Sequence, residues 1–157
     1  MSLVHNLLSL EVEPLEMADA PVGHEFSARS LTEEVGAKLT GLGVYELPPG
    51  QTSWPNHFEL GDEEWAIVIT GEVTLRTPAG ERTLRTGDVV CFPSGPEGAH
   101  LFRNDSDEVV RFAMPSTISQ GADVAVYPDS GKVKISGPGF YKRIALGPDR
   151  GYWEGEQ

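Results

Sequence analysis

A chain of 157 residues is long enough for one domain with a buried core and too short for two. Its 24 acidic residues against 12 basic ones give a formal net charge of −12, which argues against nucleic acid and anionic membranes as partners, because both select surfaces rich in Lys and Arg. The single cysteine, Cys91, cannot form an internal disulfide, so we expect a reducing compartment.

Residues 1–28 show no clear periodicity and are interrupted by Pro14, Pro21 and Gly23. We interpret them as an extended arm, with one short strand over residues 7–12, that covers the rest of the domain or packs on a second subunit. The first residues lack the basic region of a secretory signal, and no stretch approaches the roughly 18–20 apolar residues that span a bilayer. These features predict a cytoplasmic protein.

From residue 39 onward the pattern becomes all-β. Short runs of alternating or continuous apolar residues are separated by turn residues, and the chain holds 18 Gly and 12 Pro. The predicted strands are the stretch through Leu42, Val44 and Leu47, then 65–70, 73–77, 82–85, 89–92, 99–103 and 109–114, with two more pieces at 132–135 and 143–146. Short strands with turn signals roughly every 8–12 residues are typical of a sandwich or barrel.

Two turns make specific predictions. Asn104-Asp105-Ser106-Asp107 are all turn-forming residues, so we expect 99–103 and 109–114 to form a hairpin around them. Gly71 and Gly87 each stand between predicted strands. We expect at least one of these two glycines to have φ > 0, where a side chain is costly.

Four candidate metal ligands lie near the middle of the chain. The side-chain period of a strand is two, so His57 and Glu59 point to the same face. A hairpin after the short link 60–63 can fold Glu64 back beside them, and His100 follows in the segment 92–104. Two imidazoles and two carboxylates suit a divalent cation such as Zn, Fe, Mn or Ni.

The order of these residues resembles the two motifs of the cupin superfamily, whose small β-barrels hold a metal with three His and one Glu. Gly50, His57, Glu64 and Gly71 match the first motif, with Glu59 standing where that motif has a second His. The second motif is matched by Gly87, Pro93, Gly95, His100 and Asn104. Two extra residues stand between Gly95 and His100. Segments 48–50, 93–100 and 127–132 resemble one subgroup of single-domain cupins with no assigned substrate.

The resemblance implies an all-β, cupin-type jelly-roll β-barrel over residues 39–119. Residues 1–38 would form an N-terminal arm, and residues 120–157 a C-terminal tail packed on the barrel or on the partner subunit of a homodimer. It also implies a protein that binds a divalent metal and a small organic molecule, as an isomerase, oxygenase or lyase. The alternatives are a metal-free cupin that binds a small ligand without catalysis and, last, a structural or storage role.

Glu59 decides between the first two readings. Its substitution for histidine is what a barrel that has lost its metal would show. However, two carboxylates in a small cavity repel each other and are desolvated, and a divalent ion relieves both costs, so we favour metal binding through His57, Glu59, Glu64 and His100. If Glu64 points inward, the period of two also sends Ala66 and Val68 inward, and Phe102 shares the face of His100. These three residues are the predicted ligand pocket.

Overall fold

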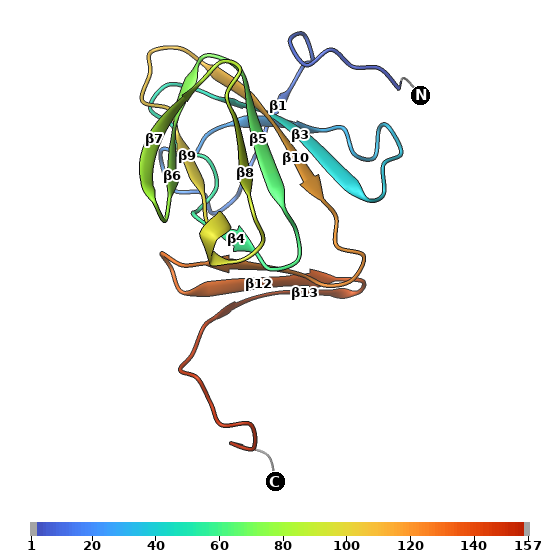
Figure 1. The fold of residues 1–157 in the computed structure, drawn as a ribbon, viewed down its shortest axis with the longest axis vertical. Helices are drawn as coiled ribbons and strands as arrows, with labels where there is room; N and C mark the ends of the chain where they lie inside the picture. Colours follow the sequence, from blue (N-terminus) through green and yellow to red (C-terminus); the bar gives the residue numbers. More distant parts are fainter. Residues whose placement is uncertain (1–2, 156–157) are drawn as a thin grey trace.

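The computed structural model describes residues 3–155, whose strands form three antiparallel sheets (Figure 1). The six-stranded sheet runs in the order β1 (Glu13–Pro14), β2 (Ser27–Ser30), β3 (Thr40–Leu47), β10 (Val110–Thr117), β5 (Glu64–Thr70), β8 (Val89–Phe92). The three-stranded sheet is β7 (Gly80–Arg85), β6 (Glu72–Thr77), β9 (Leu101–Arg103). The four-stranded sheet is β13 (Phe140–Ala145), β12 (Lys132–Gly137), β11 (Asp123–Tyr127), β4 (Phe58–Glu59). Within these described residues the one helical element is the 3₁₀ turn η1 (Pro96–Gly98), and no helix is long and apolar enough to cross a membrane.

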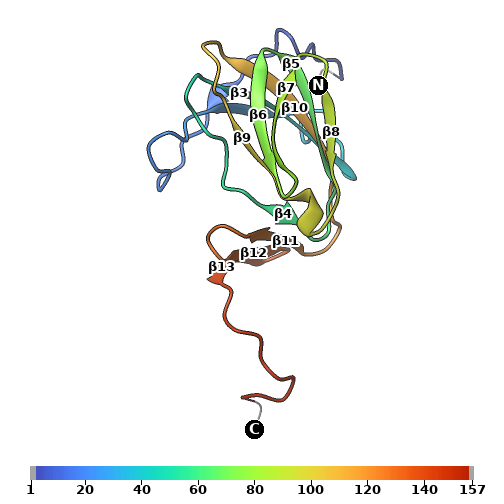
Figure 2. The same cartoon turned by 60° about the vertical axis from the view of Figure 1, so that its left-hand side comes forward.

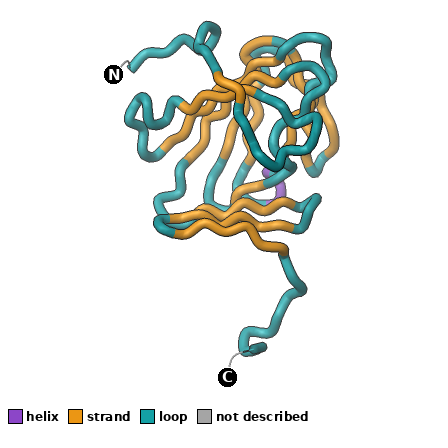
Figure 3. The backbone as a smooth tube through the Cα atoms, turned by 180° about the vertical axis from the view of Figure 1, so that it is seen from behind, coloured by secondary structure: helices purple, strands orange, loops and turns teal. Residues whose placement is uncertain are grey.

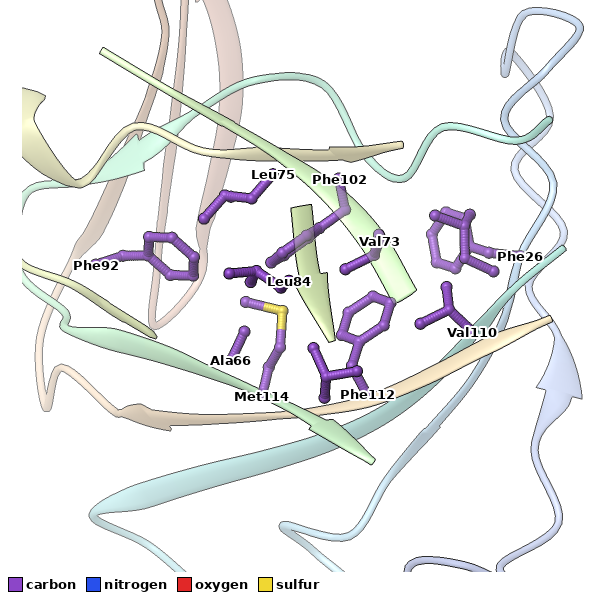
Figure 4. Packing of buried hydrophobic residues seen from close by; sticks show 12 residues of the cluster. Phe26, Ala66, Val73, Leu75, Leu84, Phe92, Phe102, Val110, Phe112 and Met114 are labelled. Atoms are coloured by element: carbon purple, nitrogen blue, oxygen red, sulfur yellow. The ribbon is translucent and has the colours of Figure 1, made fainter. Parts of the chain in front are cut away.

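The six-stranded and three-stranded sheets face each other and enclose the main hydrophobic core (Figure 4). Strand β5 shows why these residues form such a layer. Ala66 and Val68 are buried, whereas Trp65 is 43% exposed, as the period-two alternation predicts. The all-β prediction is therefore confirmed, although the strand ladders of residues 3–155 do not close the two sheets into one continuous barrel.

The C-terminal strands lie across one end of the two facing sheets (Figures 1 and 2). Seen from behind, β11, β12 and β13 form a sheet of adjacent antiparallel strands below the rest of the domain (Figure 3). They are joined to it through β4, because Ala125 pairs with Glu59 and Val126 with Phe58. Strand β11 thus joins the C-terminal strands to the rest of the domain at β4, the strand that carries the candidate site residue Glu59.

The predicted hairpin around residues 104–107 is wrong. Strand β9 pairs with β6, and β10 pairs with β3 and β5, so the chain crosses from one sheet to the other at this corner. The crossing places Phe102 and Phe112 on opposite walls of the core, fully buried, with ring centroids 4.9 Å apart. A hairpin would have put both strands in the same sheet and prevented this packing.

The predicted strand at 7–12 is also wrong. Residues 7–9 form a turn, in which the side chain of Asn6 accepts a hydrogen bond from the backbone N–H of Leu8 (2.9 Å). Asparagine commonly competes with strand pairing in this way. Leu10 is nevertheless buried, in a small cluster with Leu31 and Val44, so the arm does cover part of the six-stranded sheet.

Gly71 and Gly87 have φ values of 84° and 92°, which confirms the glycine prediction. Their surroundings differ. A Cβ at Gly71 would lie 3.1 Å from Cα of Val110 and 3.2 Å from the carbonyl oxygen of Val109, whereas a Cβ at Gly87 would meet no atom within 4 Å.

This difference makes the two glycines a matched pair. We expect Gly71→Ala to lower the free energy of unfolding by about 2–3 kcal/mol, because it adds a steric clash to the backbone strain, and Gly87→Ala by about 1 kcal/mol from strain alone. Urea denaturation of both variants measures the difference. Equal losses would show that the contact with β10 does not matter.

Candidate metal site

The rings of His57 and His100 have the same orientation: Nδ1 lies on a backbone carbonyl and Nε2 faces the other residues of the site. The Nδ1 of His57 lies 3.0 Å from the carbonyl oxygen of Pro55, and the Nδ1 of His100 lies 2.9 Å from that of Gly98. A neutral ring that donates Nδ1–H to a carbonyl leaves the lone pair on Nε2, which is how metal-binding histidines are usually oriented. The two backbones also form an antiparallel bridge, with ring centroids 4.9 Å apart.

The two extra residues before His100 are part of η1. This turn brings the carbonyl of Gly98 to Nδ1 of His100. The turn is tight, since a Cβ at Gly98 would overlap the carbonyl oxygen of Pro93. The ring of His100 is itself stacked on Phe92, with centroids 3.8 Å apart and planes 13° apart. The two extra residues therefore belong to the turn whose Gly98 carbonyl orients the His100 ring.

Glu64 completes a compact group of ligands. Its Oε2 lies 3.5 Å from Nε2 of His100 and 4.0 Å from Nε2 of His57, and one ligand atom from each residue lies within 4.8 Å of the others. Glu64 does not arrive there by a hairpin with β4, as the sequence suggested. Strand β4 pairs with β11, and β5 pairs with β8 and β10, so packing between sheets brings the three residues together.

Two atoms of this group are buried and lack hydrogen-bond partners among residues 3–155: Nε2 of His100 and Oε2 of Glu64. The side chain of His100 is only 1% exposed. Unpartnered buried polar atoms are costly, and here they face each other. A cation bound by both atoms would give each a partner, so the residues present fit a divalent metal ion.

Glu59 lies beside this group and outside it. Its Oε1 is 3.8 Å from Nε2 of His57 and 3.7 Å from Nζ of Lys134, which in turn lies 2.9 Å from Oδ2 of Asp123. Lys134 and Asp123 come from β12 and β11. Sequence reasoning missed both, as well as Tyr127, whose ring stacks on His57 with centroids 5.7 Å apart.

Burial sets the protonation of the site. It raises the pKa of Glu64 to about 7, lowers the pKa of His57 to about 4 and lowers that of His100 to about 3. Burial also raises the pKa of Glu59, an effect that the charge of Lys134 partly opposes. Without a bound cation, the site therefore favours neutral imidazoles and, below about pH 7, a protonated Glu64.

The shift at Glu64 predicts a pH dependence for the metal-free protein. Because its folded pKa is above the ordinary value of 4.5, the folded state binds more protons than the unfolded state between pH 4.5 and about 7, so stability falls as pH rises through this window. In the presence of a chelator, we expect Glu64→Gln to gain about 2 kcal/mol relative to wild type between pH 5 and pH 8. The imidazoles contribute in the opposite sense in both proteins, so the test is the difference between the variant and wild type and not either curve alone. Parallel stability curves from urea melts would contradict the prediction.

A cavity of about 270 Å³ opens beside the two glutamates. Its lining is rich in carboxylates and hydroxyls and consists of Glu59, Asp62, Glu64, Ser116, Thr117, Ile118, Ser119 and Asp123. The residues predicted to form the ligand pocket lie elsewhere. Ala66, Val68 and Phe102 are at most 2% exposed and belong to the packed core between the two facing sheets.

Comparisons with known proteins bear on the domain that holds this site. A family model described as a cupin domain matches residues 43–116, the segment that holds both histidines and both glutamates. No curated protein matches the chain.

Several solved structures have the same fold. A candidate sugar phosphate isomerase from Acidithiobacillus ferrooxidans superposes with a TM-score of 0.81 at 23% identity, over 95% of this chain and 97% of that one. A sugar phosphate isomerase from a cupin superfamily, from Silicibacter pomeroyi, gives 0.76 at 23% identity, over 89% and 90%. A polyketide cyclase from Streptomyces resistomycificus gives 0.60 at 21% identity, over 76% and 81%. At these identities the likeness is one of fold.

Proposed function

Because the chain belongs to the cupin superfamily, with its cupin domain over residues 43–116, we propose that it binds a divalent metal ion and acts on a small organic molecule held beside that ion. The metal ligands in this proposal are His57, Glu64 and His100. The two facing sheets then correspond to the cupin jelly roll, and the cavity beside the glutamates is the place of the organic ligand.

One observation carries the proposal. Nε2 of His100 and Oε2 of Glu64 are buried, unpartnered within the described chain and 3.5 Å apart, and both histidine rings are oriented by their backbone carbonyls. Two imidazoles and one carboxylate form a donor set suited to Fe(II), Mn, Zn or Ni. A bound ion would also compensate the desolvated carboxylates without requiring them to be protonated.

The chemistry that we assign is proton transfer next to a carbonyl group, as in an isomerase, in preference to an oxygenase or lyase. Glu59 supports this choice, since it is a buried carboxyl with a raised pKa beside the cavity, and an acid–base group works best when its pKa is near the working pH. A metal, when bound, would supply polarisation of the carbonyl oxygen. The carboxylate and hydroxyl lining suits an uncharged ligand that bears hydroxyl groups.

Thermal melts test metal binding. At a free Mn²⁺ or Zn²⁺ concentration of about 100 times Kd, a site present only in the folded state stabilises by about 2.7 kcal/mol, or roughly 5–10 °C in Tm for a protein of this size. We expect this rise over the chelator-treated protein for wild type and for Glu72→Gln, a control that removes an exposed carboxylate outside the site. Glu64→Gln should lose most of it.

A metal-free ligand binder is the second candidate, and Lys134 is the observation that favours it. The ammonium group lies 3.7 Å from Glu59, so the protein itself supplies a positive charge at the edge of the site. In this case the wild type should melt at the same temperature with chelator and with excess Mn²⁺ or Zn²⁺. That result would contradict the metal proposal.

A further inference from the structure

The C-terminal sheet brings a cation next to the candidate metal ligands from outside the segment 43–116. Ala125 of β11 pairs with Glu59 on one side and with Lys134 on the other. Directly paired residues point to the same face of a sheet, so Glu59 and Lys134 share one face with a single strand between them. Asp123, two residues before Ala125, lies on that face as well.

The contacts show which carboxylate holds the lysine. Nζ of Lys134 is 2.9 Å from Oδ2 of Asp123 and 3.7 Å from Oε1 of Glu59, while the hydroxyl of Ser136 lies 3.4 Å from the same Asp123 oxygen. The side chain of Lys134 is 23% exposed and that of Glu59 is 10% exposed. The ammonium group therefore lies between the two carboxyl groups, anchored on Asp123, and attracts the oxygens of Glu59 toward the C-terminal sheet.

Glu59 is within reach of a metal at the three-residue site and yet is held away from it. Two donors that bind one ion at about 2.1 Å each can be at most about 4.2 Å apart, and Oε1 of Glu59 is 3.8 Å from Nε2 of His57. However, Glu59 falls outside the group in which all ligand atoms lie within 4.8 Å of one another. Its other oxygen, Oε2, is buried without a hydrogen-bond partner in the described chain.

We propose that Lys134, anchored by Asp123, is a positioning residue that keeps Glu59 from becoming a fourth protein ligand of the metal. Glu59 then stays available to the organic ligand in the cavity. This inference rests on the proposed metal site. It assigns a role in that site to the C-terminal sheet, which the motifs of residues 43–116 do not include.

A double-mutant cycle on Mn²⁺ affinity tests the role of Lys134. The dissociation constant is measured from the free Mn²⁺ signal in electron paramagnetic resonance for wild type, Glu59→Gln, Lys134→Met and the double variant. We expect Glu59→Gln to bind within about two-fold of wild type, because Glu59 is not a ligand there. Lys134→Met should bind about ten-fold more tightly, because Glu59 is released to coordinate, and the double variant should return to the wild-type value. Lys134→Gln, which can still donate to Asp123, should reproduce Lys134→Met and serves if that variant does not fold.

Other outcomes overturn the inference in separate ways. If Lys134→Met increased Mn²⁺ affinity equally in the wild-type and Glu59→Gln backgrounds, the lysine would act only through its charge. A ten-fold loss on Glu59→Gln alone would mean that Glu59 is already a ligand. A wild type that binds no Mn²⁺ would contradict the proposed function itself, and the inference with it.

Discussion

Replacing His100 with Gln should weaken Mn²⁺ binding by a factor of at least about 100, more than the 10–100-fold typical for loss of an outer-shell partner. His100 is almost fully buried, its Nδ1 is committed to Gly98, and its Nε2 faces Glu64 at 3.5 Å. A neutral amide in this place is a poor ligand. Titration of the metal-free protein with Mn²⁺ measures the effect.

His24→Gln is the matched control for this variant. His24 also has its Nδ1 on a backbone carbonyl, that of Ser53, at 2.6 Å, but lies outside the ligand group. We expect its metal affinity to equal that of wild type. Retained Mn²⁺ affinity in His100→Gln, with both proteins folded by circular dichroism, would remove His100 from the site.

Replacing Asn104 with Ala should lower the free energy of unfolding by about 2–4 kcal/mol. The side chain is fully buried at the corner where the chain crosses between sheets. Its amide donates to the carbonyls of Leu47 (2.7 Å) and Glu108 (2.8 Å), and its Oδ1 accepts from N–H and O–H of Ser106. Alanine leaves the buried carbonyl of Leu47 unpaired, at about 1–3 kcal/mol, and also removes three partly buried hydrogen bonds, to Glu108 and Ser106.

Asn6→Ala provides the comparison, because Asn6 is exposed and makes one local hydrogen bond to Leu8. Its loss should be below about 1 kcal/mol. Both values come from urea denaturation in the presence of chelator, so that metal binding does not contribute. A loss below about 1 kcal/mol for Asn104→Ala would show that the corner is held by packing alone.

The strands that sequence reasoning located well are those whose pattern is local. Strand β5 alternates between core and surface. Gly71, between β5 and β6, and Gly87, between β7 and β8, both have positive φ. The predicted hairpin after β9 was wrong because turn residues mark a change of chain direction but do not determine which strands pair with each other. Only the need to pack Phe102 against Phe112 across the core selects the crossing.

The candidate site shows the same limit. Spacing within a strand placed His57 and Glu59 on one face, and the structure brings His57, Glu64 and His100 together. Lys134 and Asp123 could not be found in this way. They reach Glu59 through the pairing of β11 with β4, which joins segments more than sixty residues apart and leaves no periodic signal in the sequence.

The central claim is that His57, Glu64 and His100 together hold a metal ion. Pulsed electron paramagnetic resonance of the Mn²⁺-loaded protein tests it most directly, because the method detects nitrogen nuclei bonded to the ion. We expect nitrogen couplings from two imidazoles in wild type and from one imidazole in His57→Gln and in His100→Gln. A spectrum with no coordinated nitrogen, or one that neither substitution changes, would contradict the claim.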